Sequence, residues 1–431
     1  MKQARKIGLL ALVTATYSMV AGGPFGLEEI VGNNGYAWAI LILCITPVLW
    51  AIPTTLMISE LASALPVTGG FYVWVNRALG PFWGFQESWL TFMGSIFDMA
   101  IYPILFSTYL AHLVPSLGKG FIPFVMGALM IVICVAMNLL GTSFVGQESI
   151  IFVLALLAPF GILVWYGFSS SHPGAAQMTI TKPDLLGGVL IAMWNYMGWD
   201  NASMIAGDVK DARHNYTRAM TISVVVVVLT YIVPIAAVAH AGIPASNWET
   251  GSWVTFGGLL GGQKLAFLIT AAGVVAALST FNTLVMSLSR LPYAMARDGF
   301  LPKVFARENR RGAPWVAIGV CATFWALATV MGFEATVMLD VLMTGLSILL
   351  EFAALIALRI KEPDLARPFR IKGGHAGVIL LSIPPAALIA FSCARNHAER
   401  IGPINTFTLG LTLVLLGVVF YYFGNRQRAA V

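Results

Sequence analysis

The sequence contains few charged residues, which make up only 10% of its 431 residues. Typical soluble domains carry about 25%, so the composition excludes an ordinary soluble protein. Cysteine is also scarce, and the four cysteines all lie within apolar segments, at Cys44, Cys134, Cys321 and Cys393. A disulfide framework is therefore not expected, because such cysteines behave as small buried apolar residues.

Residues and motifs that bind metals or nucleotides are equally rare. The six histidines are scattered, and none has a partner at the spacing of metal ligands. No glycine-rich phosphate-binding loop is present, which leaves ATP-driven transport without support. Nothing in the sequence suggests a nucleophile with its general base. We therefore predict that the protein is not an enzyme and uses neither a metal nor a cofactor.

The sequence is strongly apolar, since 58% of the residues are hydrophobic. Apolar runs of roughly 20 residues recur, and each is long enough to cross about 30 Å of hydrocarbon. The first run is too long for a signal peptide and is expected to be retained. Hydropathy predicts an all-α polytopic membrane protein with twelve transmembrane helices. They are expected at residues 7–32, 36–62, 82–110, 121–140, 147–168, 186–207, 217–241, 264–290, 314–332, 335–358, 376–394 and 403–424.

Positive charge is distributed unevenly between the loops that join these spans. With the amino terminus inside, cytoplasmic segments hold all of the 25 Lys and Arg residues except Lys119, Lys182, Lys264, Arg395 and Arg400. This asymmetry predicts that both termini are cytoplasmic. It also explains the net charge of +6 without a nucleic-acid partner. Short loops and the absence of a targeting peptide are typical of a bacterial inner membrane protein.

Two of the predicted spans are interrupted near the middle by residues that break helices. Ala21-Gly22-Gly23-Pro24 interrupts the first span, and Met197-Gly198-Trp199-Asp200 interrupts the sixth. Backbone groups released from a helix are tolerated in hydrocarbon only where they line a cavity or bind a ligand. Broken spans at corresponding places in two halves of a chain indicate the substrate site of a secondary transporter.

The orientation makes the first and sixth spans antiparallel, as two five-helix halves of inverted topology require. We therefore expect a ten-helix transport core over residues 1–358, with halves at 1–168 and 186–358. Two additional transmembrane helices would follow over 376–424. The halves share no obvious residue-level similarity, so this division depends on hydropathy and on the positions of the breaks.

Several short motifs follow one another along the chain in a recognisable order and spacing. By these motifs the chain resembles the amino acid–polyamine–organocation (APC) superfamily of transporters, and within it the branch of polyamine-uptake and L-type amino acid transporter-like carriers. The motifs are Gly22-Gly23-Pro24-Phe25-Gly26-Leu27-Glu28-Glu29, Ser59-Glu60-Leu61-Ala62-Ser63-Ala64-Leu65-Pro66, Gly69-Gly70-Phe71-Tyr72-Val73-Trp74-Val75, Gly80-Pro81-Phe82-Trp83-Gly84-Phe85, Asp98-Met99-Ala100-Ile101-Tyr102-Pro103, Ala206-Gly207-Asp208-Val209 and Ala296-Arg297-Asp298-Gly299-Phe300-Leu301-Pro302.

The resemblance implies a five-plus-five inverted-repeat fold with two flanking helices, and alternating access to a substrate held between the two breaks. Members of the superfamily carry amino acids or polyamines, by symport with protons or sodium or by exchange. Those that carry arginine, agmatine or putrescine show Trp-x-x-x-Gly-x-Glu in helix 6. A similar pattern here, Trp194, Gly198 and Asp200, implies an aromatic cap and an acidic site residue whose side chain is one methylene shorter.

The residues themselves also suggest how a ligand is held. A helix that restarts at Pro24 would present free N–H groups to the substrate, with one donor fewer because proline lacks it. Asp98 lies mid-span with no Lys or Arg expected at its depth, so it must be protonated, hydrogen-bonded or matched by a cationic substrate. Aromatic faces also attract ammonium groups, which makes Trp194 and Trp199 candidates, with core packing as the alternative.

The other acidic residues are expected to have ordinary roles. Glu28 would favour the dipole of the restarted helix, while Glu60 and Glu87 would be solvated or salt-bridged near the cytoplasmic ends of their spans. Glu351 is expected to pair with Arg359 or with a neighbouring loop.

The coupling ion is left open by the residues. Ser279 and Thr280 in the eighth span match hydroxyls that hold sodium in some relatives, although hydroxyls also serve to join membrane helices. The fifth span lacks the lysine that replaces sodium in other relatives. Protonation of Asp98 or Asp200 is the other route.

Taken together, these features predict a secondary active transporter of polyamines or cationic amino acids, working by alternating access and coupled to protons. A neutral amino-acid transporter or exchanger on the same fold is the main alternative, and a substrate sensor that does not transport is a further one. The expected partners are a small-molecule substrate, protons or sodium, and the lipid bilayer.

Overall fold

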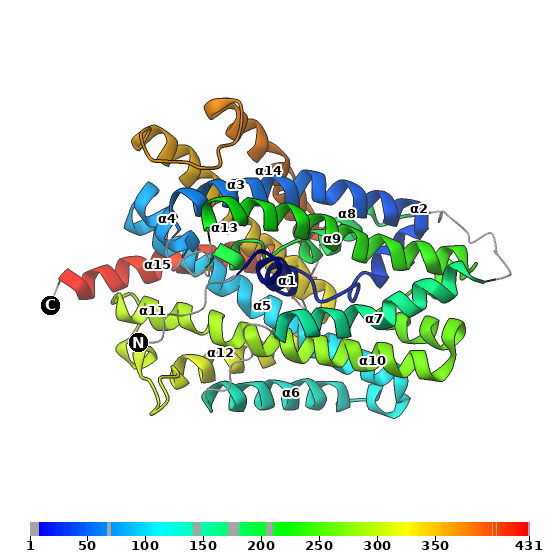
Figure 1. The fold of residues 1–431 in the computed structure, drawn as a ribbon. Coiled ribbons are helices and arrows are strands. Elements are labelled where there is room, and N and C mark those ends of the chain that lie inside the picture. Colours follow the sequence, from blue (N-terminus) through cyan, green and yellow to red (C-terminus); the bar gives the residue numbers. More distant parts are fainter. Residues whose placement is uncertain are drawn as a thin grey trace.

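The chain forms a bundle of helices in the computed structural model, which describes residues 8–66, 70–140, 148–170, 180, 182–203, 209, 211–398, 400–401 and 403–429. Most helices lie along the long direction of the bundle, with α6 (Ile122–Leu139) on one flank and α14 (Gly374–Ala398) towards the other (Figure 1). Two residue pairs form antiparallel strands, β1 (Arg400–Ile401) and β2 (Ile404–Asn405). The predicted all-α membrane fold is confirmed.

The remaining helices follow the order of the predicted spans. Within the described residues, eight helical stretches are long and apolar enough to cross a membrane, and three shorter apolar helices accompany them. The helices are α1 (Leu9–Val20), α2 (Glu28–Thr46), α3 (Ile52–Ala64), α4 (Gly70–Leu79), α5 (Pro81–Leu113), α7 (Glu148–Phe168), α8 (Leu185–Asn195), α9 (Ala212–His240), α10 (Ser252–Leu288), α11 (Arg290–Arg297), α12 (Trp315–Ala328), α13 (Phe333–Lys361) and α15 (Thr406–Ala429), with short helical turns at Pro47–Ala51, Pro115–Gly118, Ala245–Asn247, Lys303–Ala306 and Thr329–Met331.

Glycines with positive φ divide two of these helices into separate spans. Gly35 in α2 has a φ of 74°, so residues 28–34 end the first span and the second begins at Tyr36. Gly262 in α10 has a φ of 73° and separates an initial segment from the eighth span. Only glycine adopts such angles readily, which explains the interruptions. Both boundaries agree with the predicted spans.

Pro47 links the second span to the break in the sixth. Proline has no N–H to donate to the carbonyl four residues earlier, so the carbonyl of Leu43 is released from the helix. That carbonyl accepts a hydrogen bond of 3.0 Å from the Tyr196 hydroxyl, at the end of α8. A single π-helical turn over Pro47–Ala51 absorbs the irregularity. The span and the break are thereby held together.

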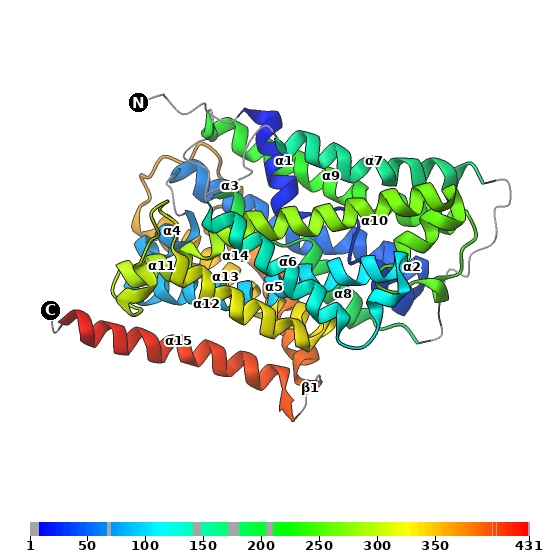
Figure 2. The ribbon, with the colours of Figure 1, turned by 90° about the horizontal axis from the view of Figure 1, so that it is seen from below.

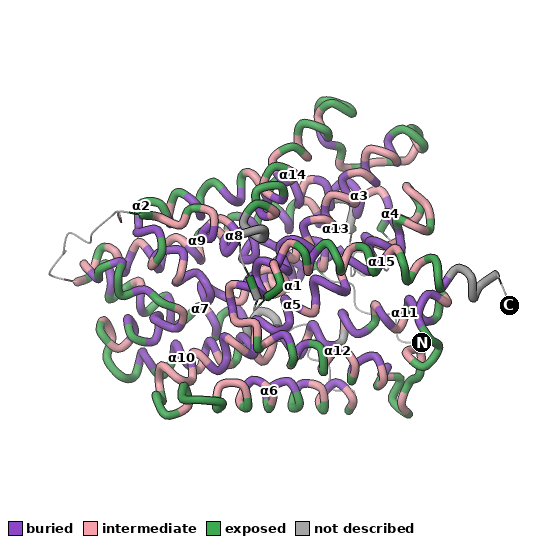
Figure 3. Tube along the Cα trace, turned by 180° about the vertical axis from the view of Figure 1, so that it is seen from behind, coloured by how far each residue is buried: buried purple, intermediate pink, exposed green. Residues whose placement is uncertain are grey.

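The centre of the bundle contains α5 and α13, which pack against each other. In the apolar 18-residue stretch of α5, 72% is buried inside the protein. In the corresponding stretches of α6, α14 and α15, the buried share is 28%, 22% and 17%. These three helices show exposed outer faces in Figure 3, and α15 runs along one side of the bundle in Figure 2. Exposed apolar faces of this kind suit contact with lipid.

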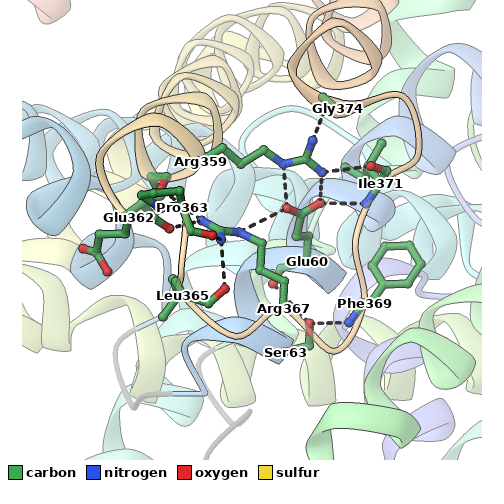
Figure 4. Close-up of polar contacts among 11 residues, drawn as sticks. Glu60, Ser63, Arg359, Glu362, Pro363, Leu365, Arg367, Phe369, Ile371 and Gly374 are labelled. Carbon is green, nitrogen blue, oxygen red and sulfur yellow. Dashed lines mark hydrogen bonds and ion pairs between the residues drawn. The ribbon is translucent and has the colours of Figure 1, made fainter.

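A buried cluster of charges holds the segment after α13 against α3 (Figure 4). Glu60 on α3 has no exposed surface and accepts hydrogen bonds from the guanidinium of Arg359, with 2.7 Å between Nε and Oε1. The Nε atom of Arg367 lies 3.5 Å from the same oxygen. The backbone N–H of Ile371 also donates to Glu60, at 2.8 Å.

This cluster corrects one sequence prediction. Arg359 does not pair with Glu351, because its guanidinium is bonded to Glu60 and to the carbonyls of Ile371 and Gly374. The salt-bridged environment expected for Glu60 is confirmed. One carboxylate here satisfies two guanidinium groups, so its loss would leave both without their counter-ion.

We predict that Glu60→Gln lowers the free energy of unfolding by about 3 kcal/mol or more, the range found when one partner of a buried ion pair is removed. The matched control is Glu362→Gln, which breaks the pair between Arg77 and Glu362, whose side chains are 46% and 30% exposed. Exposed pairs contribute about 1 kcal/mol or less. SDS titration of both variants in micelles measures the difference, and equal losses would contradict this role for Glu60.

Candidate functional site

A cavity of about 90 Å³ lies where the two predicted breaks meet. Gly22 and Phe25 line it from the first break, and Met197, Gly198 and Asp200 line it from the second. Further lining residues come from the facing sides of α5, α10 and α13. The prediction that both breaks border one shared cavity therefore agrees with the geometry.

The first break extends from Ala21 to Leu27, and side chains from other helices satisfy its backbone. The carbonyl of Pro24 accepts a hydrogen bond of 2.8 Å from Trp253 Nε1. The N–H of Gly26 donates to the Tyr109 hydroxyl over 3.2 Å. That hydroxyl in turn donates to Glu28 Oε1 at 2.6 Å. Released backbone groups are thus paired inside the protein, as hydrocarbon surroundings require.

The expected position of Pro24 is wrong. The helix restarts at Glu28, after Leu27, and not at Pro24. Gly26 has a φ of 84°, which keeps the chain out of the helical region until after it. A Cβ atom on Gly26 would lie 2.9 Å from the ring of Trp194, so glycine is also needed for this close approach.

The second break follows α8 and is satisfied in the same way. The Tyr231 hydroxyl donates to the carbonyl of Asn195 at 2.7 Å, and Trp199 Nε1 donates to the carbonyl of Tyr196 at 2.7 Å. Residues 200–203 then form a single 3₁₀ turn. Gly198 has a φ of 88°, and a Cβ atom there would lie 2.6 Å from the carbonyl oxygen of Met19, at the end of α1.

Asp98 and Trp194, two of the predicted site residues, come together in the cavity. Trp194 Nε1 donates to Asp98 Oδ1 over 3.1 Å, and the Tyr102 hydroxyl donates to the same oxygen over 3.3 Å. The ring of Trp194 also packs at right angles to Phe333, with 5.7 Å between ring centroids. The carboxyl group of Asp98 and the aromatic side chains of Tyr102 and Trp194 therefore share this part of the cavity.

The other predicted site residues divide into two groups. Asp200, Gly22, Gly198 and Thr280 line the cavity with Asp98 and Trp194. Trp199 is 1% exposed and lies outside the lining, so core packing describes it better than ligand contact. Outside the lining as well, although they belong to the breaks or to α10, are Ala21, Gly23, Pro24 and Ser279.

Asp340 is a cavity residue that the sequence reasoning missed. It lies on α13, is 4% exposed and accepts a hydrogen bond of 2.9 Å from the Thr344 hydroxyl. Its signal was the same as that of Asp98, an acidic residue inside an apolar span, Val-Met-Leu-Asp-Val-Leu-Met. Gly94 on α5 makes room for it, since a Cβ atom there would lie 3.2 Å from Asp340 Oδ1.

The cavity contains three carboxyl groups, from Asp98, Asp200 and Asp340, and its described lining includes no lysine or arginine. Asp200 Oδ1 has no hydrogen-bond partner among the residues that the structure describes. Uncompensated buried charges cost several kcal/mol each. The site is therefore suited to binding protons or a positively charged ligand.

Comparison with known proteins places similar sequences among membrane transporters. The sequence profile of the family described as amino acid permease matches residues 7–427. Polyamine transporter PUT1 of Oryza sativa subsp. japonica is 33% identical over 422 residues, which cover 96% of this chain and 77% of that protein. Polyamine transporter RMV1 of Arabidopsis thaliana is 31% identical over 97% of this chain and 85% of its own length. The serine/threonine exchanger SteT of Bacillus subtilis (strain 168) is 23% identical over 99% and 98%.

We predict that Gly198→Ala lowers the stability of the protein by about 2 kcal/mol, because an L-residue is strained at this φ and its Cβ meets the Met19 carbonyl. Gly319→Ala on α12 is the matched control, since no atom lies within 4 Å of its Cβ position; it should raise stability by about 1 kcal/mol or less. Thermal unfolding in detergent, followed by tryptophan fluorescence, compares the two. An unchanged midpoint for Gly198→Ala would disprove the close approach of Gly198 to the end of α1.

Proposed function

The chain belongs to the amino acid permease family and is a secondary transporter of the amino acid–polyamine–organocation type, and we propose that its cargo is a polyamine or a cationic amino acid. Alternating access would expose the cavity between the two breaks to each side in turn. The single observation that carries the proposal is the group of three cavity carboxyls without a basic partner in the described lining.

The charge of the cavity favours an ammonium cargo. Asp98 acts electrostatically on Asp340, and Asp200 acts on both. A ligand with two or more ammonium groups would neutralise several of these carboxylates at once. The aromatic face of Trp194 adds a further attraction for a cation. A diamine thus matches both the charge and the aromatic lining of the cavity.

The same geometry is less suited to the carboxylate of a zwitterionic amino acid. In a carrier with a broken first helix, that carboxylate would bind at the free N–H groups where the helix restarts. Here the first turn of the restarted helix carries Glu28 and Glu29. The N–H of Gly26 is already bonded to Tyr109. An anionic group placed there would meet negative charge rather than free donors.

The relatives support the same order of preference. Two relatives at 31–33% identity over nearly the whole chain are polyamine transporters, whereas the serine/threonine exchanger is 23% identical. Transport or exchange of a neutral amino acid is the second candidate, and that exchanger is the observation in its favour. We also propose proton coupling, because buried carboxyls without counter-ions bind protons readily.

The arrangement in the membrane is proposed from the distribution of basic residues. Arg77, Arg297 and Arg367 follow or end spans that would point into the cytoplasm, which puts both termini on that side. The core would comprise residues 1–358, in halves 1–168 and 186–358, with flanking helices within 376–424. A bacterial inner membrane is the proposed location.

Competition in proteoliposomes tests the cargo. Uptake of labelled putrescine should be inhibited by putrescine, spermidine and arginine, and should be insensitive to alanine. The expected reason is that only the first three carry a net positive charge to match the cavity carboxyls, whereas alanine is a zwitterion without net charge. Inhibition by alanine alone would reject the cationic cargo and favour the neutral amino-acid alternative.

Asp98→Asn tests the part of the site that binds charge. We predict at least a tenfold loss of affinity for putrescine, equivalent to about 1.4 kcal/mol, because the change removes charge with almost no change of volume. The measurement is concentration-dependent uptake by equal amounts of reconstituted protein. Asp364→Asn makes the same change on an exposed loop and should have no effect. Wild-type affinity in Asp98→Asn would remove this residue from the site.

A further inference from the structure

A second pair of buried acids lies on the same two helices as the cavity acids. Glu87 on α5 and Glu351 on α13 have no exposed surface. Each is eleven residues from the cavity acid of its own helix, Asp98 or Asp340. At 1.5 Å per residue, this spacing is roughly 16 Å along each helix. Eleven residues are also close to three turns of about 3.6 residues, so the two levels of carboxyls lie on one face of α5 and on one face of α13.

The four acids pair across the helices. Asp340 interacts electrostatically with Asp98, and Glu351 interacts with Glu87. The hydroxyl of Ser347, one turn from Glu351, donates to Glu87 Oε1 at 2.5 Å. Because both pairs match, α5 and α13 are antiparallel here, and the glutamates form a level of their own beyond the cavity.

Most carboxyl oxygen atoms of the two glutamates lack hydrogen-bond partners within the described part of the chain. Glu87 Oε2 and both carboxyl oxygens of Glu351 have none among the described residues. In the described part of the chain, these carboxyl groups accept hydrogen bonds only at Glu87 Oε1, from the Ser347 hydroxyl and, at 3.4 Å, from the Thr91 hydroxyl. Unsatisfied buried carboxyls of this kind require an explanation beyond packing, because each lost partner costs free energy.

Among the residues that the structure describes, the other ionisable groups around the pair do not supply a counter-ion. Asp200 from the second break acts electrostatically on both glutamates, and Tyr216 of α9 lies within range of Glu351. Arg359, two turns further along α13, is bonded to Glu60. In the described part of the chain, no lysine or arginine forms an ion pair with Glu87 or Glu351. Such a pair is stable only with a bound proton or cation.

The space around the pair suits a proton rather than an ammonium group. Neither glutamate lines the cavity, whereas Thr91 does. The Thr91 and Ser347 hydroxyl oxygens are 3.1 Å apart, and both hydroxyls contact Glu87. A hydroxyl can donate and accept at the same time. Thr91 and Ser347 therefore connect Glu87 to the cavity by hydrogen bonds alone.

We propose that Glu87 and Glu351 form the proton-binding site that couples this transporter to a proton gradient, separate from the carboxyls that bind the cargo. The inference builds on the cargo proposed above. In the loaded state the pair holds one proton, which is carried by Glu87 and favoured there by the neighbouring charge of Glu351. On release its O–H bond breaks, the electron pair remains on the carboxylate, and the Thr91 hydroxyl accepts the proton while passing its own to water in the cavity.

Asp200 provides the connection between the two sites. It acts electrostatically on Glu87 and Glu351 at one level and on Asp98 and Asp340 at the other. Binding of a cation beside Asp200 therefore changes the potential at the glutamate pair. Cargo binding and proton binding become dependent on one another without sharing a ligand, as linkage requires.

Two transport assays on reconstituted protein separate the proton site from the cargo site. In the first, a pH gradient that is acid outside drives accumulation of labelled putrescine. In the second, labelled putrescine exchanges with unlabelled putrescine at equal pH on both sides. For Glu351→Gln and for Glu87→Gln we expect at least a tenfold loss of gradient-driven accumulation, with less than a twofold change in exchange. Glu249→Gln, an exposed control, should change neither.

Each of the other possible results of these assays would overturn a specific part of the proposal. Gradient-driven accumulation that survives in both variants would overturn the proton site. Loss of exchange as well, in protein that still unfolds at the wild-type temperature, would overturn the separation of the two sites. Weaker inhibition by spermidine alone, with the gradient response intact, would identify an ammonium site instead. If the wild-type protein neither binds nor exchanges any amine, the proposed cargo fails, whatever the glutamate variants do.

Thr91→Val provides a second route if a glutamate variant does not fold. Valine has nearly the shape of threonine but removes the hydroxyl that joins Glu87 to the cavity. Gradient-driven accumulation should fall at least fivefold, and by a larger factor than exchange, because Thr91 also lines the cavity. An unchanged gradient response would contradict this proton path.

Discussion

Negative charge that is buried along α5 and α13, without a counter-ion among the described residues, is the constraint on which the rest of the structure depends. The acids Glu87, Asp98, Asp340 and Glu351 face one another across these two helices, with Asp200 acting on all of them. Leaving such groups ionised and unpaired inside a membrane costs several kcal/mol each. Protons and cationic ligands relieve that cost, so the charge pattern itself defines what this protein can bind.

The two breaks give ligands access to those acids without leaving the backbone unsatisfied. Tyr109 and Trp253 bond to the first break, and Tyr231 and Trp199 bond to the second. Large polar aromatics serve well here, because they bury apolar area while presenting one donor at the end of the ring. The broken segments are thus held in place by side chains and can border a cavity without collapsing onto it.

The sequence alone was sufficient to predict the helices and the positions of the breaks, because glycine and proline inside an apolar run usually mark an interruption of the helix. Asp98 was recognisable from its charge inside an apolar span, and Asp340 satisfied the same rule. Trp194 was recognisable from the resemblance of its helix to the pattern in members of the superfamily. The restart at Glu28 could not be predicted, since it depends on the positive φ of Gly26 and on its contact with Trp194. The direction of Trp199, and the pairing of Arg359 with Glu60 rather than Glu351, depend on tertiary contacts that no local pattern encodes.

A structure determined with putrescine bound tests the central claim most directly. The account predicts ligand density in the cavity between the breaks, with one ammonium nitrogen within about 3 Å of a carboxyl oxygen of Asp98 or Asp340, the distance of a charge-assisted hydrogen bond. Density elsewhere, or in the cavity with both nitrogens away from every carboxyl group, would contradict it.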